Sequence, residues 1–395
     1  MVTYYIDFEN GTTHADGLSP ESARKIYDDI ALMPGDQVLF RRGSFIRGKL
    51  NAKRFISYGA YGEGEAPTFC CSLDISKKED WFLTNVKNVW KCTKTFDGEV
   101  GNLIFNAGEC TATFRWTKDE LCANGDFYSN TSDGVKKEDG KVPAELYIYC
   151  ESNPGQFYSH IEAASFGARC AVSLADGMTL DGIRVINSGV HGMAGHGDGI
   201  TIRNCEFENI GGCACHRHLK IRFGNAIEIW QHGNDILIEN CTFKNIYDSC
   251  VTYQGPGEAT EPSRNFICKN CKFDTYGMAA IEYRDKMPIR SVFSGNECKN
   301  AGCGFAMLGE SKPRMSEIWP QPMGHHVFLW RINEPTDGGE ISICNNLFGE
   351  CKEGSAIYSI ISERAEAQIS LKGNVCLDGC TPLCHFGGKD QILML

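Results

Sequence analysis

One short phrase recurs through the second half of the chain, and it limits the possible folds more than any other feature. The phrase begins with an apolar residue and a spacer residue. Asn or Gly comes next, followed by Cys or Asn, and the phrase ends with any residue and then Phe or Cys. The copies are Ile202–Phe207, Ile238–Phe243, Cys268–Phe273, Phe293–Cys298, Ile343–Phe348 and Leu371–Cys376. Their starts lie 36, 30, 25, 50 and 28 residues apart, which indicates a basal unit of about 25 residues with insertions. A unit this short cannot bury its apolar face alone, so neighbouring units must stack.

A second short segment with period-2 alternation lies between copies of the phrase. It is seen at Asn225–Trp230, Ser249–Gln254, Ala279–Arg284 and Ser355–Ser359. Two or three short strands per unit, with Gly and Asn at the corners, predict an all-β chain built as a parallel β-solenoid. A propeller has longer repeats. We expect corner Asn side chains to hydrogen-bond from coil to coil, beside an internal ladder of Cys205, Cys241 and Cys271.

The first 160 residues depart from this pattern and predict two further parts. Residues 1–80 are expected to hold an N-terminal cap and the first coils. Ser19 as N-cap, Pro20 after it and an apolar stripe ending near Ile30 predict one amphipathic capping helix. Residues 81–160 lack the phrase and are rich in aromatic residues, which predicts a small inserted antiparallel β subdomain.

Residues 161–395 are then expected to form the main β-helix, with loop insertions near 211–222 and 309–335. Loops between coils usually form the walls of a cleft. The segment from Gly309 to Pro335 carries Trp319, His325, His326 and Trp330, and we interpret it as a lid or an oligomer contact. A homo-oligomer remains open at this stage.

Charge and cysteine content narrow the function and the compartment. The 395 residues carry 39 basic against 50 acidic side chains, a net charge of −11, which disfavours a nucleic-acid partner. No apolar run reaches the ~20 residues of a membrane span, and the first seven residues show no secretion signal. The 21 cysteines are an odd number in a long chain, so we predict reduced core thiols and a cytoplasmic protein.

Two sets of residues resemble the right-handed parallel β-helix proteins of the pectate-lyase-like superfamily. One is the opening stretch with Tyr4–Asp7, Ser19-Pro20, Pro34–Val38 and Arg42–Phe45. The other comprises Gly224–Glu228 and Tyr247-Asp248 with Gln254-Gly255, which look like an uncharacterised carbohydrate-active bacterial subgroup. The resemblance implies a right-handed helix and an oligosaccharide substrate. It leaves the reaction open, because the superfamily includes lyases, hydrolases, epimerases, esterases and non-catalytic proteins.

Alignment of the inward aliphatic residues predicts which side chains face outward. Ile227, Val251 and Ile281 form one inward column, and Ile229, Tyr253 and Tyr283 form the next. Strand side chains alternate, so Glu228, Thr252 and Glu282 form one outward column, and Trp230, Gln254 and Arg284 form its neighbour. We expect this exposed face to be the catalytic face, with Glu228, Glu282 and the corner residue Asp248 as catalytic carboxylates.

Substrate contacts are predicted from the same face and from the loops beside it. Trp230 would stack on a sugar ring, and Gln254 and Arg284 would bind hydroxyls or a carboxylate. From the loops we add His196, His216, His218 and Arg222 as substrate-binding residues. Cys213 and Cys215 bring zinc-ligand types to the His216 and His218 loop, but their spacing is too tight for a known finger, so we predict no metal site.

Three functions remain. A glycoside hydrolase acting on short oligosaccharides would use the carboxylates as acid and base or nucleophile, needs no cofactor, and is favoured because the face is richer in carboxylates than in Lys. A lyase acting on a uronic acid glycan would use Asp198, Glu228, Asp248 and Glu282 to hold Ca²⁺. A non-catalytic glycan-binding β-solenoid is the third.

Overall fold

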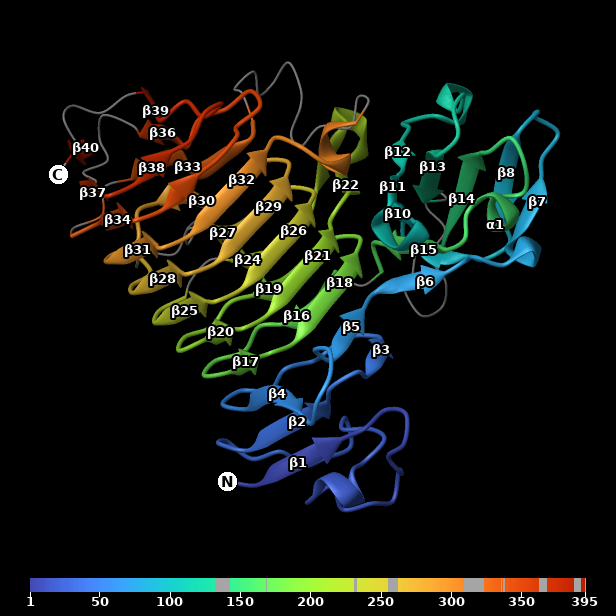
Figure 1. Cartoon of the computed structure of the whole chain (residues 1–395), viewed down its shortest axis with the longest axis horizontal. Helices are drawn as coiled ribbons and strands as arrows, with labels where there is room; N and C mark the ends of the chain where they lie inside the picture. The colour runs from blue at the N-terminus through green and yellow to red at the C-terminus, as the bar shows by residue number, and fades with distance from the viewer. Residues whose placement is uncertain are drawn as a thin grey trace.

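The computed structural model describes residues 1–131, 143–167, 169–230, 233–254, 262–308, 323–334, 336, 338–361, 368–386 and 392–394. The main body consists of three parallel sheets, and each successive coil of the chain adds a strand to them (Figure 1). The coils stack from the N-terminal end to the C-terminal end, with the polar corners between sheets on the outside. The predicted parallel β-solenoid is therefore confirmed.

Each sheet collects the strands that occupy the same position in successive coils. Sheet A contains β1 (Thr3–Ile6), β2 (Gln37–Arg41), β4 (Ser57–Tyr61), β17 (Thr179–Asp181), β20 (Thr201–Arg203), β25 (Ile236–Glu239), β28 (Phe266–Lys269), β31 (Ser291–Ser294), β34 (Glu340–Cys344), β37 (Gln368–Lys372) and β40 (Ile392–Met394). Sheet B contains β3 (Phe45–Arg47), β5 (Thr68–Cys70), β18 (Arg184–Ser188), β21 (Glu206–Ile210), β26 (Thr242–Ile246), β29 (Lys272–Tyr276), β32 (Glu297–Ala301), β35 (Leu347–Phe348) and β38 (Val375–Cys376). Sheet C contains β16 (Cys170–Ser173), β19 (His191–Gly195), β24 (Ile227–Ile229), β27 (Ser249–Gln254), β30 (Ala279–Lys286), β33 (His325–Glu334), β36 (Ile357–Ile361) and β39 (Leu383–Phe386).

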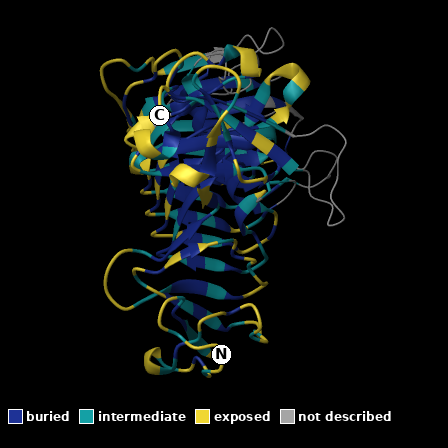
Figure 2. Cartoon of the chain, turned by 90° about the vertical axis from the view of Figure 1, so that its right-hand side faces the viewer, coloured by how far each residue is buried: buried dark blue, intermediate teal, exposed yellow. Residues whose placement is uncertain are grey.

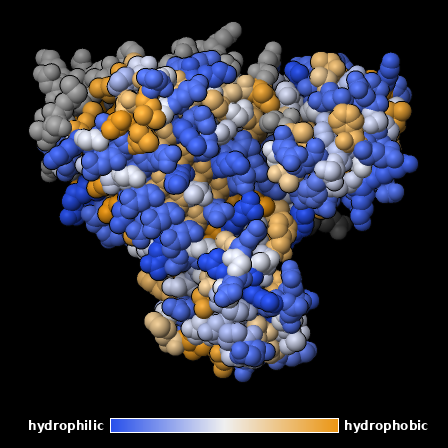
Figure 3. Space-filling model, viewed as in Figure 1, coloured by the Kyte–Doolittle hydropathy of each residue, from blue (hydrophilic) through white to orange (hydrophobic). Residues whose placement is uncertain are grey.

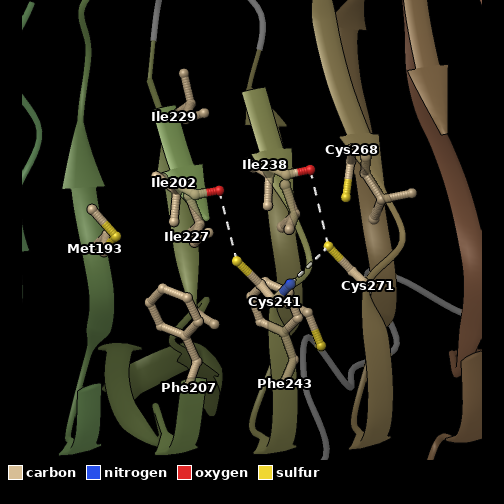
Figure 4. Packing of buried hydrophobic residues seen from close by; sticks show 14 of the residues in the cluster. Met193, Ile202, Phe207, Ile227, Ile229, Ile238, Cys241, Phe243, Cys268 and Cys271 are labelled. Atoms are coloured by element: carbon tan, nitrogen blue, oxygen red, sulfur yellow. Dashed lines mark hydrogen bonds between the residues drawn. The ribbon is translucent and has the colours of Figure 1, made fainter. Parts of the chain in front are cut away.

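The core lies inside the coils, where like residues stack on like (Figures 2 and 4). Phe207, Phe243 and Phe273 stack with centroid separations of 5.1 and 4.8 Å and interplanar angles of 7° and 5°. These distances are close to the ~4.8 Å strand spacing, so the ladder itself sets the aromatic contact. Each such pair adds about 1 kcal/mol beyond its buried area.

The cysteine ladder is confirmed, and it continues as an asparagine ladder. Cys205, Cys241 and Cys271 are buried, and the Cys271 thiol accepts from the Cys241 amide at 3.4 Å (Figure 4). In the next coil Asn296 occupies this ladder position, and its Oδ1 accepts a hydrogen bond from the Cys271 backbone amide at 2.9 Å. Asn346 and Asn374 extend this ladder. All 21 cysteines are free thiols.

The Asn residue before each of the first three ladder cysteines has a different use. Asn204, Asn240 and Asn270 have φ of 54°, 53° and 55°. This left-handed conformation turns the corner between two sheets, and Asn tolerates it better than most residues.

The predicted N-terminal capping helix is wrong. Only one 3-10 turn, η1 (Pro20–Ser22), forms, with Ser19 as its N-cap. The chain then becomes extended, because Arg24 accepts a hydrogen bond from the Asp7 amide at 2.8 Å and donates to the Tyr5 carbonyl at 2.9 Å. The open edge of β1 therefore forms hydrogen bonds with the backbone of this segment, and a helix would have paired those backbone groups within itself.

An inserted unit with mainly antiparallel pairing lies beside the main body (Figure 1). One sheet has β6 (Ser72–Asp74), β15 (Ile161–Ser165), β10 (Val100–Phe105) and β11 (Cys110–Thr111); the other has β7 (Trp81–Leu83), β8 (Val89–Cys92), β9 (Phe96–Asp97), β14 (Pro143–Tyr149), β13 (Asp126–Thr131) and β12 (Thr113–Phe114). Its first strand begins before residue 81 and its last strand ends after residue 160, the two limits expected for the inserted subdomain. The division of the chain into domains stays a prediction. The short helices are η2 (Lys78–Asp80), η3 (Asn106–Gly108), η4 (Lys118–Glu120) and α1 (Pro154–Phe157), with η5 (Arg217–Leu219) and η6 (Phe305–Met307) in the main body.

The expected 309–335 insertion is partly corrected. Residues 323–334 belong to the coils, since β33 pairs with β30 and β36 in sheet C. The alternation of Val327 and Leu329 with Phe328 and Trp330 is a strand pattern that the loop interpretation overlooked. Residues 309–322, with Trp319, lie outside the described residues.

The outer face of the molecule in Figure 3 is mainly hydrophilic. This is the expected result when outward strand positions and corner loops carry the charged residues. Within the described residues, no helix has both the length and the apolar character to cross a membrane.

One ion pair, with a buried carboxylate and a partly exposed guanidinium, connects the inserted unit to the early coils. Arg47 in β3 donates to both carboxylate oxygens of Glu162 in β15, at 2.8 and 2.6 Å, and Ser72 donates to the same carboxylate at 2.7 Å. Burial alone would raise the pKa of Glu162. The hydrogen bonds from Arg47 and Ser72 outweigh burial and hold this pKa below its ordinary value.

We predict that Arg47→Met lowers the free energy of unfolding by about 2 kcal/mol at pH 7, less than for a fully buried pair because Arg47 is partly solvated. The folded-state pKa of Glu162 is depressed, so its contribution is present above the unfolded pKa and lost as pH falls through the folded one. Urea unfolding at pH 7 and below pH 4 should show the difference from wild type disappearing in acid. Arg54→Met, which removes an exposed pair with Asp176, is the control and should change little. A pH-independent loss for Arg47→Met would contradict the ion-pair explanation.

Candidate functional site

The outer face of sheet C carries the two columns expected from the sequence. Glu228, Thr252 and Glu282 are register partners on β24, β27 and β30, and Gln254 is the partner of Arg284. The inward partners Ile227, Val251 and Ile281 are also in register, so the predicted alternation is confirmed.

The prediction that this face is exposed is wrong. Glu228 is 2% exposed and Glu282 is 0% exposed. Both side chains point away from the coil interior, but neighbouring side chains cover them. On the next coil, Phe328 is the register partner of Glu282, and it belongs to a second buried apolar cluster outside the coils.

A pocket of about 380 Å³ opens on this face, within the ~300–1,000 Å³ range of small-molecule sites. Six predicted residues line it: Glu228, Asp248, Trp230, Gln254, Arg284 and His216. The remaining lining residues, which the prediction of site residues omitted, are His191, Cys215, Ile221, Phe223, Asn225 and Trp330.

Four predicted site residues lie outside this lining. Glu282 accepts a hydrogen bond from the Ser249 hydroxyl at 3.2 Å beneath the face. His196 and His218 are exposed on neighbouring loops. Arg222 is buried, and its function is discussed below.

Asn225 holds the base of the pocket together. Its side-chain amide donates to Oε2 of Glu228, and its Oδ1 accepts from the Ser249 amide at 2.8 Å. Its backbone N–H donates to Nδ1 of His191 at 3.1 Å. One residue at the start of the β24 coil therefore orients a carboxylate and an imidazole and connects them to the next coil.

His191 is neutral in this setting. Burial lowers its pKa to about 3, and the charge of Arg169 acts in the same direction. A backbone N–H can only donate, so Nδ1 is the acceptor and the ring proton is on Nε2. The ring packs edge-to-face against Trp230 and Phe223, at 5.6 and 5.3 Å. His191 is therefore a hydrogen-bond donor and not a base.

Aromatic side chains and one guanidinium form the other side of the pocket. Arg284 lies over the Trp330 ring, with Cζ 4.7 Å from the centroid. Trp330 is its register partner on β33. The pocket thus combines Glu228 and Asp248 with a cation held on an aromatic face. Trp330 extends the predicted outward column, and it would have been found if residues 325–334 had been aligned as a strand.

A hairpin forms one wall of the pocket. It pairs β22 (Cys213–His216) with β23 (Ile221–Phe223). Cys213 turns to the buried side, where its thiol lies 3.3 Å from the Glu99 carbonyl. Glu99 accepts from the Ala214 amide at 2.9 Å and from Arg217 at 2.6 Å. The inserted unit therefore fixes the position of this wall, with Cys213 on one side of the hairpin and His216 in the pocket.

Arg222 is the anchor of this hairpin, which corrects its expected placement in the cleft. It is 1% exposed, and its guanidinium donates to the carbonyls of Gly212 and Gly101, the latter at 2.6 Å. Its charge lies between the rings of Phe114 and Tyr247, at 4.2 and 4.6 Å from their centroids. Arg222 thus joins the inserted unit, the hairpin and the corner that carries Asp248.

The comparisons with known proteins concern the fold. Residues 147–317 match the family model described as the right handed beta helix region. No curated protein matches the sequence. The three parallel sheets and this match confirm a right-handed parallel β-helix.

Similar solved structures include a pectate lyase, an alginate lyase and an exopolygalacturonase. Pectate lyase Pel9A has 12% identity and a TM-score of 0.40, over 100% of this chain and 79% of that chain. Alginate lyase from Paenibacillus sp. str. FPU-7 has 9% identity and a TM-score of 0.39, over 92% and 93%. The family 28 exopolygalacturonase of Yersinia enterocolitica has 10% identity and a TM-score of 0.31, over 98% and 79%.

We predict that Arg222→Met lowers the free energy of unfolding by about 3 kcal/mol, because two buried carbonyls lose their donor. The hairpin should also become more sensitive to trypsin at Arg217 and Lys220. Urea unfolding and timed proteolysis measure the two effects. Arg203→Met, on an exposed corner, is the control. Unchanged stability and unchanged cleavage would contradict the anchoring role.

Proposed function

We propose that this chain is a carbohydrate-active enzyme, and that it hydrolyses glycosidic bonds of short oligosaccharides in the pocket on sheet C. The observation that carries the proposal is that Glu228 and Asp248 both line that pocket. Both residues are at most 2% exposed. Burial of two carboxylates has a high free-energy cost that a solvated β-face would avoid, so their burial at a pocket indicates use.

The two carboxylates are suited to different roles. The Asn225 amide donates to Oε2 of Glu228 and orients this carboxylate in the pocket, which supports a role as base or nucleophile. Asp248 is then the general acid that protonates the leaving oxygen. This assignment replaces Glu282 by Asp248 as the partner of Glu228, because Glu282 lies outside the pocket lining.

The remaining lining residues suit a sugar. Trp230 and Trp330 offer aromatic surface, Gln254 offers amide donor and acceptor groups, and His191 offers a donor. Arg284 is the group that would recognise an acidic sugar, since guanidinium binds carboxylate through paired hydrogen bonds. Free thiols throughout the chain fit a reducing compartment, and we include a cytoplasmic location in the proposal.

Elimination receives less support from the same pocket. Of the four acids considered for Ca²⁺, only Glu228 and Asp248 line it, and Asp198 accepts from the Asn234 amide on an exposed turn. Ca²⁺ takes 6–8 oxygen ligands, so the described donor set fits the ion poorly. Nδ1 of His191 already accepts from the Asn225 amide, which leaves Nε2–H as a donor toward the pocket and gives little support to His191 as the base of an elimination.

The test is incubation of the purified protein with neutral and uronic oligosaccharides, followed by mass spectrometry of the products. Hydrolysis predicts products that together contain one added water, with no effect of EDTA. Glu228→Gln and Asp248→Asn should each lower kcat/KM by about 10³-fold while the melting temperature is kept. Glu282→Gln is the matched comparison and should keep most activity.

Three results would argue against the proposal. Unsaturated products without added water would indicate a lyase. A loss confined to Glu282→Gln would move the site away from Asp248. Binding of a glycan without turnover, in wild type as in the variants, would indicate the non-catalytic alternative.

We further predict that Arg284→Gln raises KM for an acidic oligosaccharide by about 30-fold, the value of one charge-assisted contact, and leaves KM for a neutral analogue unchanged. Steady-state kinetics on a matched acidic and neutral pair measure this. Lys286→Gln, on the same strand but outside the pocket lining, is the control. An equal rise in KM for both sugars would show that Arg284 maintains the shape of the pocket and does not recognise the acidic group of the sugar.

A further inference from the structure

Three metal-ligating side chains converge at the C-terminal end of the coils. His326 lies in β33, Cys351 follows β35, and Cys380 follows β38. A ring nitrogen of His326 and the two sulfur atoms all lie within 4.8 Å of one another. None of the three residues lines the pocket on sheet C.

The spacing of the two thiols matches a shared metal ion. The Sγ atoms of Cys351 and Cys380 are 3.9 Å apart. Two thiolates on a tetrahedral zinc ion, each ~2.3 Å from the metal, would lie ~3.8 Å apart. A disulfide requires ~2.05 Å, so the present separation resembles an edge of a metal tetrahedron more closely than a bond about to form.

The imidazole of His326 is held as a ligand histidine is usually held. Nε2 donates to the Gly349 carbonyl at 3.0 Å, which leaves the lone pair on Nδ1, where the Tyr276 hydroxyl now donates. The ring also stacks on Phe348 at 5.3 Å. A metal ion would replace the Tyr276 hydroxyl at Nδ1, and the Gly349 contact would keep the ring oriented.

Small side chains make room for the ring and the sulfur atoms. Ala301 is the register partner of both Tyr276 and Cys351. Cys376 carries another thiol on β38, but it is exposed and lies outside this three-residue cluster. The close ligand set is therefore one histidine and two cysteines, ligand types that zinc prefers.

A metal site would stabilise the final coils, which pack less extensively than the coils before them. Cys376 in β38 is exposed, whereas its register partner Phe348 in the preceding coil is fully buried. A terminal coil has a neighbour on one side only, so it gains less from stacking. A metal held by residues of three successive coils supplies folding free energy where the core is thinnest.

We propose that His326, Cys351 and Cys380 bind one Zn²⁺ ion that connects the last three coils. The three ligands come from successive coils and none lines the pocket on sheet C, so the ion acts on stability and not in that pocket. This inference does not depend on the proposed function.

The test measures metal content and stability without any activity assay. Protein produced in zinc-supplemented medium and purified under reducing conditions should contain about one Zn²⁺ per chain, and removal by a chelator should lower the melting temperature. Replacement by Co²⁺ should give thiolate-to-cobalt charge-transfer absorption. Cys351→Ser and Cys380→Ser should each lower the zinc content at least tenfold, and Cys344→Ser, which changes a half-buried thiol of β34, should not.

Wild-type measurements keep the proposal testable if a variant fails to fold. Zinc below a tenth of an equivalent in wild type, or cobalt spectra without thiolate bands, would overturn it. Zinc retained in both ligand variants would place the ion elsewhere and overturn it too. A Cys351–Cys380 disulfide found by peptide mapping of protein prepared under reducing conditions would assign the pair to redox chemistry instead.

Discussion

The whole structure depends on the parallel backbone ladder that stacks each coil on the one before it. This ladder holds equivalent residues of neighbouring coils at the strand spacing, so like side chains contact like. Phe207 stacks on Phe243, Cys241 on Cys271 and Asn346 on Asn374 for the same geometric reason. Each coil is stable only because its neighbours cover its two edges.

The same constraint concentrates chemistry on one face. Outward positions of sheet C repeat at strand spacing, which brings Gln254, Arg284 and Trp330 into one column. A carboxylate in such a column would normally be solvated. Here the hairpin supplies Cys215, His216, Ile221 and Phe223 as one wall of the pocket, and Arg222 anchors the hairpin to the inserted unit. Part of the pocket that holds Glu228 and Asp248 is therefore built by residues outside the repeat.

The two ends of the solenoid meet the edge problem differently. At the N-terminal end, the chain around Arg24 pairs with the backbone of β1 and satisfies its open edge. At the C-terminal end, β38 has exposed side chains and thiols gather beside His326. Each end of the solenoid lacks a neighbouring coil. Backbone hydrogen bonds compensate at the N-terminal end, and we propose that a metal ion compensates at the C-terminal end.

The sequence by itself determined the coil: its repeat, its inward columns and the register of Ile227, Val251 and Ile281 follow from local alternation, which is a property of the strand. It also identified half of the residues that line the pocket, namely His216, Glu228, Trp230, Asp248, Gln254 and Arg284. It could not show that Arg222 anchors a wall, that His191 joins the pocket, or that Glu282 lies beneath it. Those outcomes depend on contacts between segments more than 100 residues apart in some cases, such as Arg222 with Gly101, and only the tertiary structure brings these segments together.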